Sequence, residues 1–507
     1  MALATVFSRA RHGLDAPLVS VEVHLANGLP GLSLVGLPEA AVRESKDRVK
    51  AAIINSGFSF PARRITVNLA PADLPKDGGR FDLAIAIGIL AAAGEIATDP
   101  LKQYEFLGEL SLSGHLRPII GALPAALACA KHNRQLIIPV DNGGEAALSS
   151  DNETLTADHL LSVCAHLAQR DPLPPAEQVS YLPVETDHPD LRDVRGQHQA
   201  KRALEVAAAG GHHLLFVGPP GSGKSMLASR FAGLLPPLSE PQALEVAAIQ
   251  SISQGAVDLK AWKRRPFRQP HHTASAIALA GGGGIPQPGE ISLAHHGVLF
   301  LDELPEFSRH ALEVLREPME SGVITISRAA RQAEYPARFQ LIAAMNPCPC
   351  GWWGDANGRC SCTREQMLRY AAKISGPLLD RIDLQLYVKP VAAEQISVTH
   401  GHAPSEGSEQ IRQRVTLARQ RQLERQGKAN AALLPAELAG HIQLTAPALD
   451  VVDQAMQRLQ LSARAYHRIL KVARSIADLA DRETVDTQHI GEALQYRQMD
   501  RNLRSAG

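Results

Sequence analysis

The stretch from Gly218 to Ser225 constrains this chain more than any other eight residues. It reads GPPGSGKS and fits the pattern G-x-x-x-x-G-K-[ST] in full. It follows the apolar run Leu214–Val217 and opens an apolar-periodic run at 226–235, so the pattern predicts a strand, a glycine loop and a helix in that order. Backbone N–H groups of such a loop turn inward around phosphates. The stretch therefore predicts a nucleoside-triphosphate site.

Each residue type in this loop has an expected task. Lys224 is expected to reach the β- and γ-phosphates, and Ser225 is expected to ligate Mg²⁺. A glycine-rich turn with an unrelated lysine is the alternative, and the complete motif with both flanks argues against it. The residues expected to bind the nucleotide are Gly218, Pro219, Pro220, Gly221, Ser222, Gly223, Lys224 and Ser225.

Composition limits the classes of protein that remain. A chain of 507 residues with 45% hydrophobic and 21% charged residues is expected to be soluble and to form about two to four domains. No window approaches the ~18 consecutive apolar residues of a membrane span. The first residues do not form a signal peptide pattern, so we expect a cytoplasmic protein. With 52 basic and 52 acidic residues, any nucleic-acid binding must come from a local patch.

Four regions are expected along the chain. Residues 1–168 alternate strand and helix patterns, and the proline-rich residues 169–190 are expected to form a linker. Residues 191–395 hold the P-loop and again alternate strands and helices. Residues 396–507 are poor in glycine and are expected to be helical. The clearest expected elements are strands at 19–25, 64–69 and 135–139 and helices at 83–93 and Ala463–Leu479.

A second apolar run, Val298–Leu301, ends in the two carboxylates Asp302 and Glu303. A strand that merely reaches a solvated loop would look the same, but its position downstream of a P-loop favours a catalytic interpretation. Asp302 is expected to hold Mg²⁺ through water. Glu303 is expected to polarise the attacking water as the general base.

Three polar residues further on are candidates for the same site. A third buried strand ends at Asn346, which is placed to orient the lytic water. Arg381 lies in a short polar turn, and an arginine there in a ring ATPase stabilises charge at the neighbouring subunit's nucleotide. A surface salt bridge is the alternative for Arg381. Arg464 begins a helix and is expected to reach the γ-phosphate from the lid, although Arg468 and Arg474 compete for that role.

These elements, in this order, resemble the AAA+ ATPases of the magnesium-chelatase and MCM helicase branch. Gly196 and Gln197 look like the adenine-side box, and residues 270–295 resemble the insert that precedes the carboxylate strand in magnesium chelatases. Nearly the whole chain resembles the magnesium chelatase-like family of the ComM and YifB type. The resemblance implies an α/β fold, with a P-loop AAA+ core and a helical lid, that uses ATP and Mg²⁺. It also implies a hexameric DNA helicase that extends branched recombination intermediates in natural transformation.

Two N-terminal stretches are similar to the protease domain of Lon and to the C-terminal domain of RadA. They are PKDGGRFDL at 75–83 and GELSLSGHLRPIIG at 108–121. The similarity implies an α+β domain of the Lon type, which is ribosomal protein S5 domain 2-like. Lon proteases cut with a serine that a lysine activates. Here Arg80 takes the serine's place and Pro124 the lysine's, so proteolysis is not expected. The domain is expected to serve oligomerisation or DNA contact, or to be a passive scaffold for a ring.

Four of the six cysteines form two C-x-C pairs separated by nine residues. Two thiolate pairs on a short loop can close a structural tetrahedral Zn²⁺ site. Free thiols are the alternative, because C-x-C is tighter than the usual C-x-x-C. The candidate ligands are Cys348, Cys350, Cys360 and Cys362. Cys129 and Cys164 are expected to be core residues.

The histidine pairs His271/His272 and His295/His296 have no further ligands at a regular spacing. We expect them to be buried or hydrogen-bonded structural residues.

Residues 324–335 alternate and predict a β-hairpin. In MCM-like ATPases a hairpin at this point enters the central pore, so Arg328 and Arg331 are candidates for a salt-sensitive grip on a DNA backbone. A hairpin with solvated arginines and no DNA contact is the alternative. Five further arginines are expected to form a solvated face of the lid, with DNA contact or subunit packing as the alternative: Arg412, Arg414, Arg419, Arg421 and Arg425.

Two classes of function fit these patterns. The first is an ATP-driven, ring-forming DNA translocase that promotes branch migration. It is expected to be a homohexamer and not to associate with a membrane. The second is a magnesium-chelatase-type motor that remodels a partner protein complex. Such motors resemble the ATPase region but have no Lon-like domain in front of it, which favours the first class.

Overall fold

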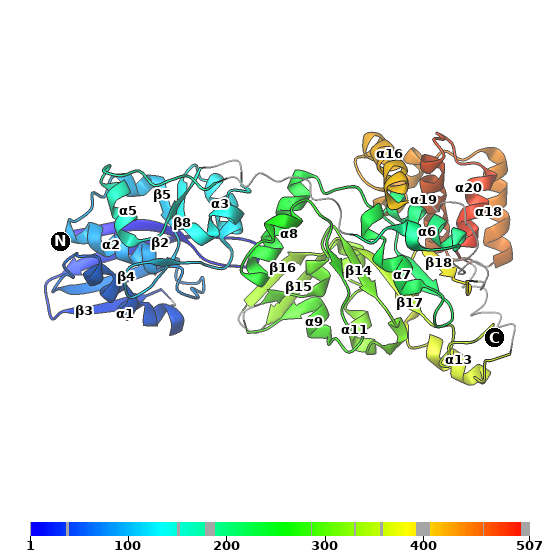
Figure 1. The fold of residues 1–507 in the computed structure, drawn as a ribbon, viewed down its shortest axis with the longest axis horizontal. Coiled ribbons are helices and arrows are strands. Elements are labelled where there is room, and N and C mark those ends of the chain that lie inside the picture. Colours follow the sequence, from blue (N-terminus) through cyan, green and yellow to red (C-terminus); the bar gives the residue numbers. More distant parts are fainter. Residues whose placement is uncertain are drawn as a thin grey trace. The chain divides into compact units, whose positions relative to one another are not determined.

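The computed structural model describes residues 2–36, 40–149, 153–177, 188–284, 286–328, 331–354, 358–391, 406–459 and 461–497. The chain divides into two compact units (Figure 1). Unit 1 consists of Met1–Val184, Glu240–Trp262 and Ser327–Glu334, and unit 2 of Glu185–Ser239, Lys263–Ile326 and Tyr335–Gly507. Residues 240–262 lie in the expected ATPase region of the sequence but belong to unit 1. Part of the expected linker, 178–187, lies outside the described residues.

Unit 1 is built on a seven-stranded mixed sheet with the strand order β3-β4-β2-β1-β5-β8-β9. The β1–β2 and β2–β4 pairs are antiparallel and the other pairs are parallel. Buried and half-buried residues alternate along β2, as expected for a strand with one face on the core. The strands of this sheet are β1 Ala2–Arg9, β2 Leu18–Ala26, β3 Gly31–Val35, β4 Arg64–Ala70, β5 Tyr104–Phe106, β8 Gln135–Pro139 and β9 Thr154–Ala157. Two short strands, β6 Glu109–Leu110 and β7 Leu116–Arg117, pair separately.

Helix α2, Asp82–Ala93, is buried from Asp82 to Ala92 and packs against β1 and β2. It ends at Gly94, whose φ of 87° is the left-handed conformation that glycine adopts without strain. Helix α8 follows the P-loop in the sequence but also belongs to this unit, and its Ala247 packs against Leu123 of α3. The helices of unit 1 are α1 Ala40–Asn55, α2, α3 Ala122–Ala130, α4 Gly143–Ala146, α5 Leu160–Leu167 and α8 Glu240–Gln254.

Unit 2 contains a five-stranded parallel sheet with the order β11-β14-β17-β10-β18. Strands β10 and β14 are entirely apolar and buried, as expected for strands that are covered on both faces. Because all the strands are parallel, their carboxyl ends meet at one edge, where α/β sheets bind ligands. The strands are β10 Leu214–Val217, β11 Phe267–Arg268, β14 Val298–Leu301, β17 Gln340–Met345 and β18 Leu384–Tyr387. Two short strands, β12 Gly281–Gly282 and β13 Gln287–Pro288, pair separately.

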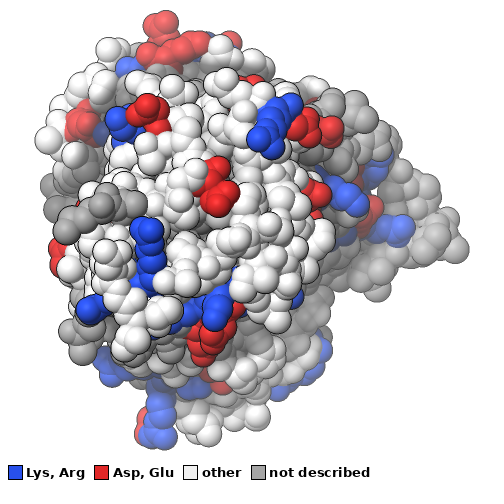
Figure 2. Space-filling view, turned by 90° about the vertical axis from the view of Figure 1, so that its left-hand side faces the viewer, with Lys and Arg blue, Asp and Glu red and all other residues white. Residues whose placement is uncertain are grey.

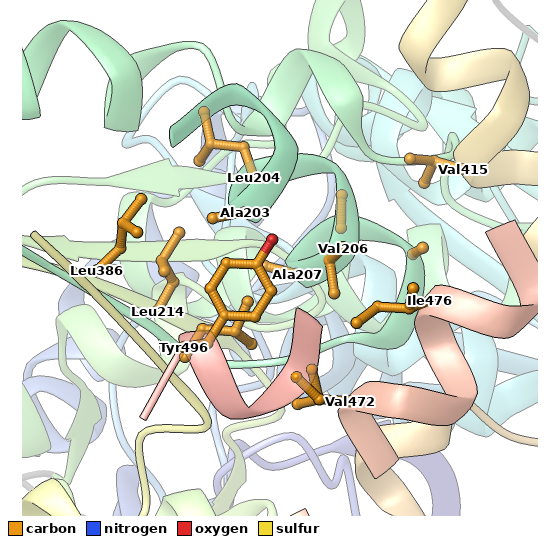
Figure 3. Packing of buried hydrophobic residues seen from close by; sticks show 14 of the residues in the cluster. Ala203, Leu204, Val206, Ala207, Leu214, Leu386, Val415, Val472, Ile476 and Tyr496 are labelled. Atoms are coloured by element: carbon orange, nitrogen blue, oxygen red, sulfur yellow. The ribbon is translucent and has the colours of Figure 1, made fainter. Parts of the chain in front are cut away.

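A helical lid packs on this sheet through helix α6, His198–Gly210. Residues of α6, the sheet and the lid form one continuous hydrophobic cluster. Figure 3 shows part of this cluster, with labels on Ala203, Leu204, Val206, Ala207, Leu214, Leu386, Val415, Val472, Ile476 and Tyr496. The lid helices are α16 Ser408–Gln426, α17 Leu438–His441, α18 Ala446–Leu459, α19 Ala463–Leu479 and α20 Thr487–Gln495. The other α-helices among the described residues of unit 2 are α7 Lys224–Ser229, α9 Ala276–Ala280, α10 Glu290–Leu293, α11 Arg309–Glu313, α12 Pro318–Ser321, α13 Arg364–Ala371 and α14 Gly376–Leu379.

The helix after the P-loop is shorter than the expected run at 226–235. Helix α7 ends at Ser229, and a separate 3₁₀ turn covers Ala232–Leu234. Gly233 weakens a continuous helix here, and two prolines follow at 236–237. The expected hairpin is present as β15, Val323–Arg328, and β16, Arg331–Pro336. The side chains of Arg328 and Arg331 lie outside the described residues.

The expectation that the arginines of α16 form a solvated face is wrong. Arg414 pairs with Glu205 of α6 at 2.6 Å and also with Glu406. Arg419 donates to the carbonyls at the end of α6, Ala208 O and Ala209 O, at 2.8 and 3.0 Å. The other three pair within the lid: Arg412 with Glu409, Arg421 with Asp481 and Arg425 with Asp478. These side chains hold the lid together and fix it on α6.

No helix in the described part of the chain is long and apolar enough to cross a membrane.

Candidate nucleotide site

The P-loop lies at the carboxyl end of β10 with Lys224 folded over it. Lys224 Nζ donates to Gly218 O at 2.9 Å and to Pro219 O at 3.0 Å, and it lies 3.3 Å from Asn346 Oδ1. Burial lowers the pKa of Lys224, while the charges of Asp302 and Glu303 oppose that shift. Gly221 and Gly223 have φ angles of 74° and 87°, which glycine adopts without strain. The lysine is therefore held at the mouth of the loop by neutral oxygen atoms.

The two expected magnesium ligands are in direct contact. Ser225 Oγ donates to Asp302 Oδ2 at 2.5 Å, and Glu303 N donates to Asp302 Oδ1 at 2.9 Å. Strand β17 lies between β14 and β10, so the ends of these three strands bring the carboxylates, Asn346 and the P-loop to one place. The convergence of Lys224, Ser225, Asp302 and Asn346 follows directly from this strand order.

Glu303 stands at the start of a 3₁₀ turn with a φ of 52°, and its side chain is about half exposed. Its Oε2 atom lies 3.1 Å from Nδ1 of His272. The neighbouring His271 instead lies 2.9 Å from the hydroxyl of Thr273. Sequence spacing gave no sign that His272 would contact Glu303, because the two residues are far apart in the chain and the histidine pair was expected to be only structural.

Of the second histidine pair, His295 fits the expectation of a buried, hydrogen-bonded residue. His295 is buried, and its Nδ1 accepts from Arg338 N at 3.0 Å. The two rings contact each other at a tilt of 46°, with their centroids 3.9 Å apart.

A cavity of about 230 Å³ lies beside the P-loop, between the start of α6 and the end of β18. It is lined by residues 197–200 and 386–391. Gln197 fixes this side of the site, because its Nε2 donates to Ser222 O at 3.1 Å and to Lys389 O at 2.8 Å. Gly196, with a φ of 60°, precedes it in the turn. Of the two expected adenine-side residues, Gln197 therefore both contacts the P-loop and lines the cavity.

Arg381 is buried against its own subunit. It donates to Pro377 O at 2.7 Å and pairs with Glu320, whose side chain is mostly exposed. The salt-bridge alternative for this residue is therefore present in the single chain.

Arg464 lies in the first turn of α19, which Ser462 caps by accepting a hydrogen bond from Ala465 N. Arg464 is exposed, whereas the two other candidates for the γ-phosphate contact, Arg468 and Arg474, already form ion pairs. Arg474 pairs with Asp478, and Arg468 donates to Asp383 at 2.9 Å.

Asp383 connects the lid to the sheet. Its carboxylate also lies 3.3 Å from Nδ1 of His212, which stands two positions before the start of β10. Burial opposes ionisation of Asp383, but the hydrogen bond of His212 and the charge of Arg468 outweigh it and hold the pKa of the carboxyl below its usual range. Arg468 is therefore a structural residue that ties α19 to the turn after Arg381.

The four clustered cysteines come together in space. The thiols of Cys348, Cys350, Cys360 and Cys362 all lie within 4.8 Å of one another, in unit 2. All of them are free thiols. Cys129 and Cys164 belong to unit 1, where they lie in α3 and α5 and are buried, as expected.

In unit 1, the places of the protease dyad are occupied by buried residues. Arg80 is buried, which lowers its pKa to about 10, and its guanidinium lies 3.4 Å from Ile120 O. Pro124 is buried within α3. On the face of this unit that Figure 2 shows, basic and acidic side chains are scattered among uncharged residues, and no patch of one sign covers it.

Comparison with known proteins identifies relatives over the whole chain. Three family models match in order: "Subunit ChlI of Mg-chelatase" at residues 21–142, "Magnesium chelatase, subunit ChlI" at 190–396, and "Magnesium chelatase, subunit ChlI C-terminal" at 405–497. The competence protein ComM of Haemophilus influenzae is 51% identical over 99% of both chains. YifB of Escherichia coli (strain K12) is 50% identical over 99% of this chain and 98% of its own.

A more distant similarity covers only part of the chain. The magnesium-chelatase 67 kDa subunit of Chlorobaculum parvum is 30% identical over 31% of this chain and 23% of its own.

Proposed function

The chain belongs to the magnesium chelatase-like AAA+ family of the ComM and YifB type, and on that premise we propose that it is an ATP hydrolase whose ring moves along DNA. The observation that carries the proposal is the convergence of Lys224, Ser225, Asp302 and Glu303 at the ends of adjacent parallel strands. The family to which the chain belongs supports ATP and Mg²⁺ as its cofactors.

The residues present fit these two cofactors. Ser222 Oγ is buried without a hydrogen-bond partner, inside the loop that would receive the phosphates. A Cβ atom on Gly218 would lie 2.3 Å from Val388 O, so this position has room only for glycine. Ser225 and Asp302 offer the hard oxygen ligands that Mg²⁺ prefers, and bound Mg²⁺ would neutralise phosphate charge. The cavity lined by residues 197–200 and 386–391 is the proposed place of the adenine.

The catalytic roles follow from position. Lys224 exchanges its carbonyl partners for phosphate oxygens, Glu303 accepts a proton from the attacking water, and Asn346 orients that water. His272 holds the Glu303 carboxylate in place at 3.1 Å. Arg464 reaches the γ-phosphate from the lid.

The site is completed by a neighbouring subunit. In the proposed homohexamer, Arg381 leaves Glu320 and stabilises transition-state charge at the nucleotide of the next chain. A ring of this kind would present the β15–β16 hairpins to a central pore, where Arg328 and Arg331 grip the DNA backbone. Hydrolysis then moves the hairpins along the strand and extends branched recombination intermediates. Support for this step comes from the full-length similarity to a protein that is named for competence.

The cysteine cluster is the proposed site of a structural Zn²⁺. Four thiolates within 4.8 Å of one another match the Cys₄ sites that hold zinc.

Proteolysis is not proposed for unit 1, since Arg80 and Pro124 supply neither a nucleophile nor a base. A fluorophosphonate probe for reactive serines is expected to leave the protein unlabelled, and labelling of unit 1 would contradict this view.

The proposal is tested by ATP hydrolysis with and without single-stranded or forked DNA at moderate salt. We expect DNA to be retained and to raise the hydrolysis rate of the wild type. Hydrolysis that ignores DNA, together with no DNA retention, would instead favour the remodelling of a partner protein complex.

A further inference from the structure

The loop that carries the four cysteines lies against the P-loop. This cysteine loop, residues 347–362, follows directly after Asn346, and its residues 355–357 lie outside the described part of the chain. The ligands that it offers and the contacts that it makes are therefore parts of one segment.

The sulfur positions match a single tetrahedral metal ion. Metal–sulfur bonds of about 2.3 Å in a tetrahedron place neighbouring sulfur atoms about 3.8 Å apart. Here the separations are 3.4 Å for Cys348–Cys350, 3.6 Å for Cys350–Cys360 and 3.8 Å for Cys348–Cys360. These distances are far longer than a disulfide bond of about 2.05 Å. The cluster therefore has the size of a closed structural zinc site.

Gly351 brings this loop onto the P-loop. It has a φ of 84°, and a Cβ atom at this position would lie 2.7 Å from Cδ of Pro220 and 3.8 Å from Cγ of Asn346. Pro220 is the third residue of the P-loop. The backbone of the cysteine loop thus lies too close to the phosphate loop for a side chain at this position, and a Cβ there would also reach the residue proposed to orient the attacking water.

A second contact lies on the side of the proposed adenine cavity. Trp353 N donates to Cys348 Sγ at 3.3 Å, and Trp353 O accepts from the Tyr387 hydroxyl at 3.3 Å. Tyr387 is one of the residues that line the cavity of about 230 Å³. A metal at the thiols would therefore fix one segment against both sides of the nucleotide site.

We propose that the Cys348, Cys350, Cys360 and Cys362 thiolates bind one Zn²⁺ and that the cysteine loop, once fixed by the metal, forms a wall of the nucleotide site. Metal occupancy then controls how tightly the chain binds nucleotide. This inference rests on the proposed function of the P-loop as the nucleotide site. It assigns the cysteine loop a role in nucleotide binding, in addition to holding its own segment together.

The test measures metal content and nucleotide affinity separately on the full chain. Zinc is measured by plasma mass spectrometry, and affinity by titration with the fluorescent analogue mant-ADP in excess Mg²⁺. We expect one zinc per wild-type chain. Removal of zinc with a zinc-selective chelator is expected to weaken mant-ADP binding by about tenfold, and added Zn²⁺ is expected to restore it.

Variants separate the metal from the contact. Cys360→Ser is expected to lose zinc and to weaken binding. Gly351→Ala is expected to keep zinc and still weaken binding, because its methyl group pushes the loop away from Pro220. The matched control is Gly358→Ala in the same loop, since Gly358 also has a positive φ, 70°, but a Cβ there meets nothing within 4 Å. This control is expected to keep both zinc and affinity.

The results distinguish the zinc site, the contact with Pro220 and the nucleotide site from one another. A wild type without zinc, or with iron in its place, would overturn the inference. A zinc-free chain that binds mant-ADP as tightly as the zinc-loaded chain would also overturn it. Equal loss of affinity in Gly351→Ala and Gly358→Ala would overturn the contact with Pro220. A zinc-loaded wild type that binds no mant-ADP would instead contradict the proposed nucleotide site itself.

Discussion

Unit 1 and unit 2 both contain glycine-rich motifs, but their polar side chains meet different surroundings. In unit 1, the place of a catalytic serine is held by the buried Arg80. In unit 2, Lys224 is partnered by neutral oxygens and Glu303 is half exposed beside His272. A glycine-rich motif can therefore be present without the catalytic side chains that usually accompany it. An active site is better recognised by reactive side chains that lie close together and remain accessible.

The largest expected effect is the loss of hydrolysis in Glu303→Gln. The variant is expected to bind ATP but to hydrolyse it about 10³-fold more slowly, because an amide cannot accept the proton of the attacking water. The control is Glu306→Gln, three residues later, where an exposed carboxylate pairs with Lys373. Measurement of ATP binding and steady-state hydrolysis in both variants checks this. ATP hydrolysis by Glu303→Gln at the wild-type rate would show that Glu303 is not the general base.

The counterpart in unit 1 is structural. Glu105 is fully buried and accepts from Arg9 at 2.5 and 2.8 Å and from Arg134 at 3.2 Å. Glu105→Gln leaves the buried Arg9 without its counter-charge and is expected to destabilise unit 1 by about 3 kcal/mol. Hydrogen exchange of β1, β5 and β8 reports this loss for unit 1 alone.

The same variant tests the contrast between the units. ATP hydrolysis per folded molecule is expected to stay unchanged. The control is Glu109→Gln, whose carboxylate is partly exposed and lies 3.8 Å from Arg117. If Glu105→Gln lowers ATP hydrolysis while hydrogen exchange in unit 1 stays unchanged, a charge of unit 1 takes part in ATP hydrolysis. The proposed difference between the two units would then be wrong.

Arg381→Ala tests whether the site of unit 2 is shared between chains. We expect nucleotide binding to remain and hydrolysis to fall about 10²-fold, as for the loss of one donor to transition-state charge. Mixing this variant with Lys224→Ala chains should recover activity, because some interfaces then combine an intact Lys224 with an intact Arg381. The control Arg369→Ala removes an exposed arginine that pairs with Glu365 of the same helix, α13. No recovery on mixing would mean that Arg381 acts within its own subunit.

The smallest of these effects is expected for His272→Ala. Loss of its contact with Glu303 is expected to lower kcat about tenfold with little change in KM, since the contact orients the base and does not bind substrate. His271→Ala is the matched control, because that ring contacts Thr273 instead. Equal kinetics for the two variants would show that the 3.1 Å contact has no catalytic role.

The sequence predicted those elements of unit 2 that are specified by neighbouring residues in the chain. The P-loop, the strand before Asp302 and helix α19 at Ala463–Leu479 all appear where the patterns put them. Apolar runs and caps specify such elements locally.

The parts that could not be predicted depend on contacts between distant residues. His272 reaches Glu303, and Gly351 reaches Pro220, only after the sheet has formed. The arginines of α16 looked solvated because the partners of Arg414 and Arg419 lie on α6, about 200 positions earlier. Charge patterns along one helix do not reveal partners on another element.

In the proposed function, ATP hydrolysis at Lys224 powers movement of DNA strands. A branch-migration assay on a synthetic three- or four-stranded junction, with wild type and Lys224→Ala in parallel, tests this step. We expect ATP-dependent strand exchange by the wild type and none by Lys224→Ala. Wild-type protein that hydrolyses ATP but leaves the junction unmoved, or Lys224→Ala that moves it equally well, would show that the site does not drive DNA movement.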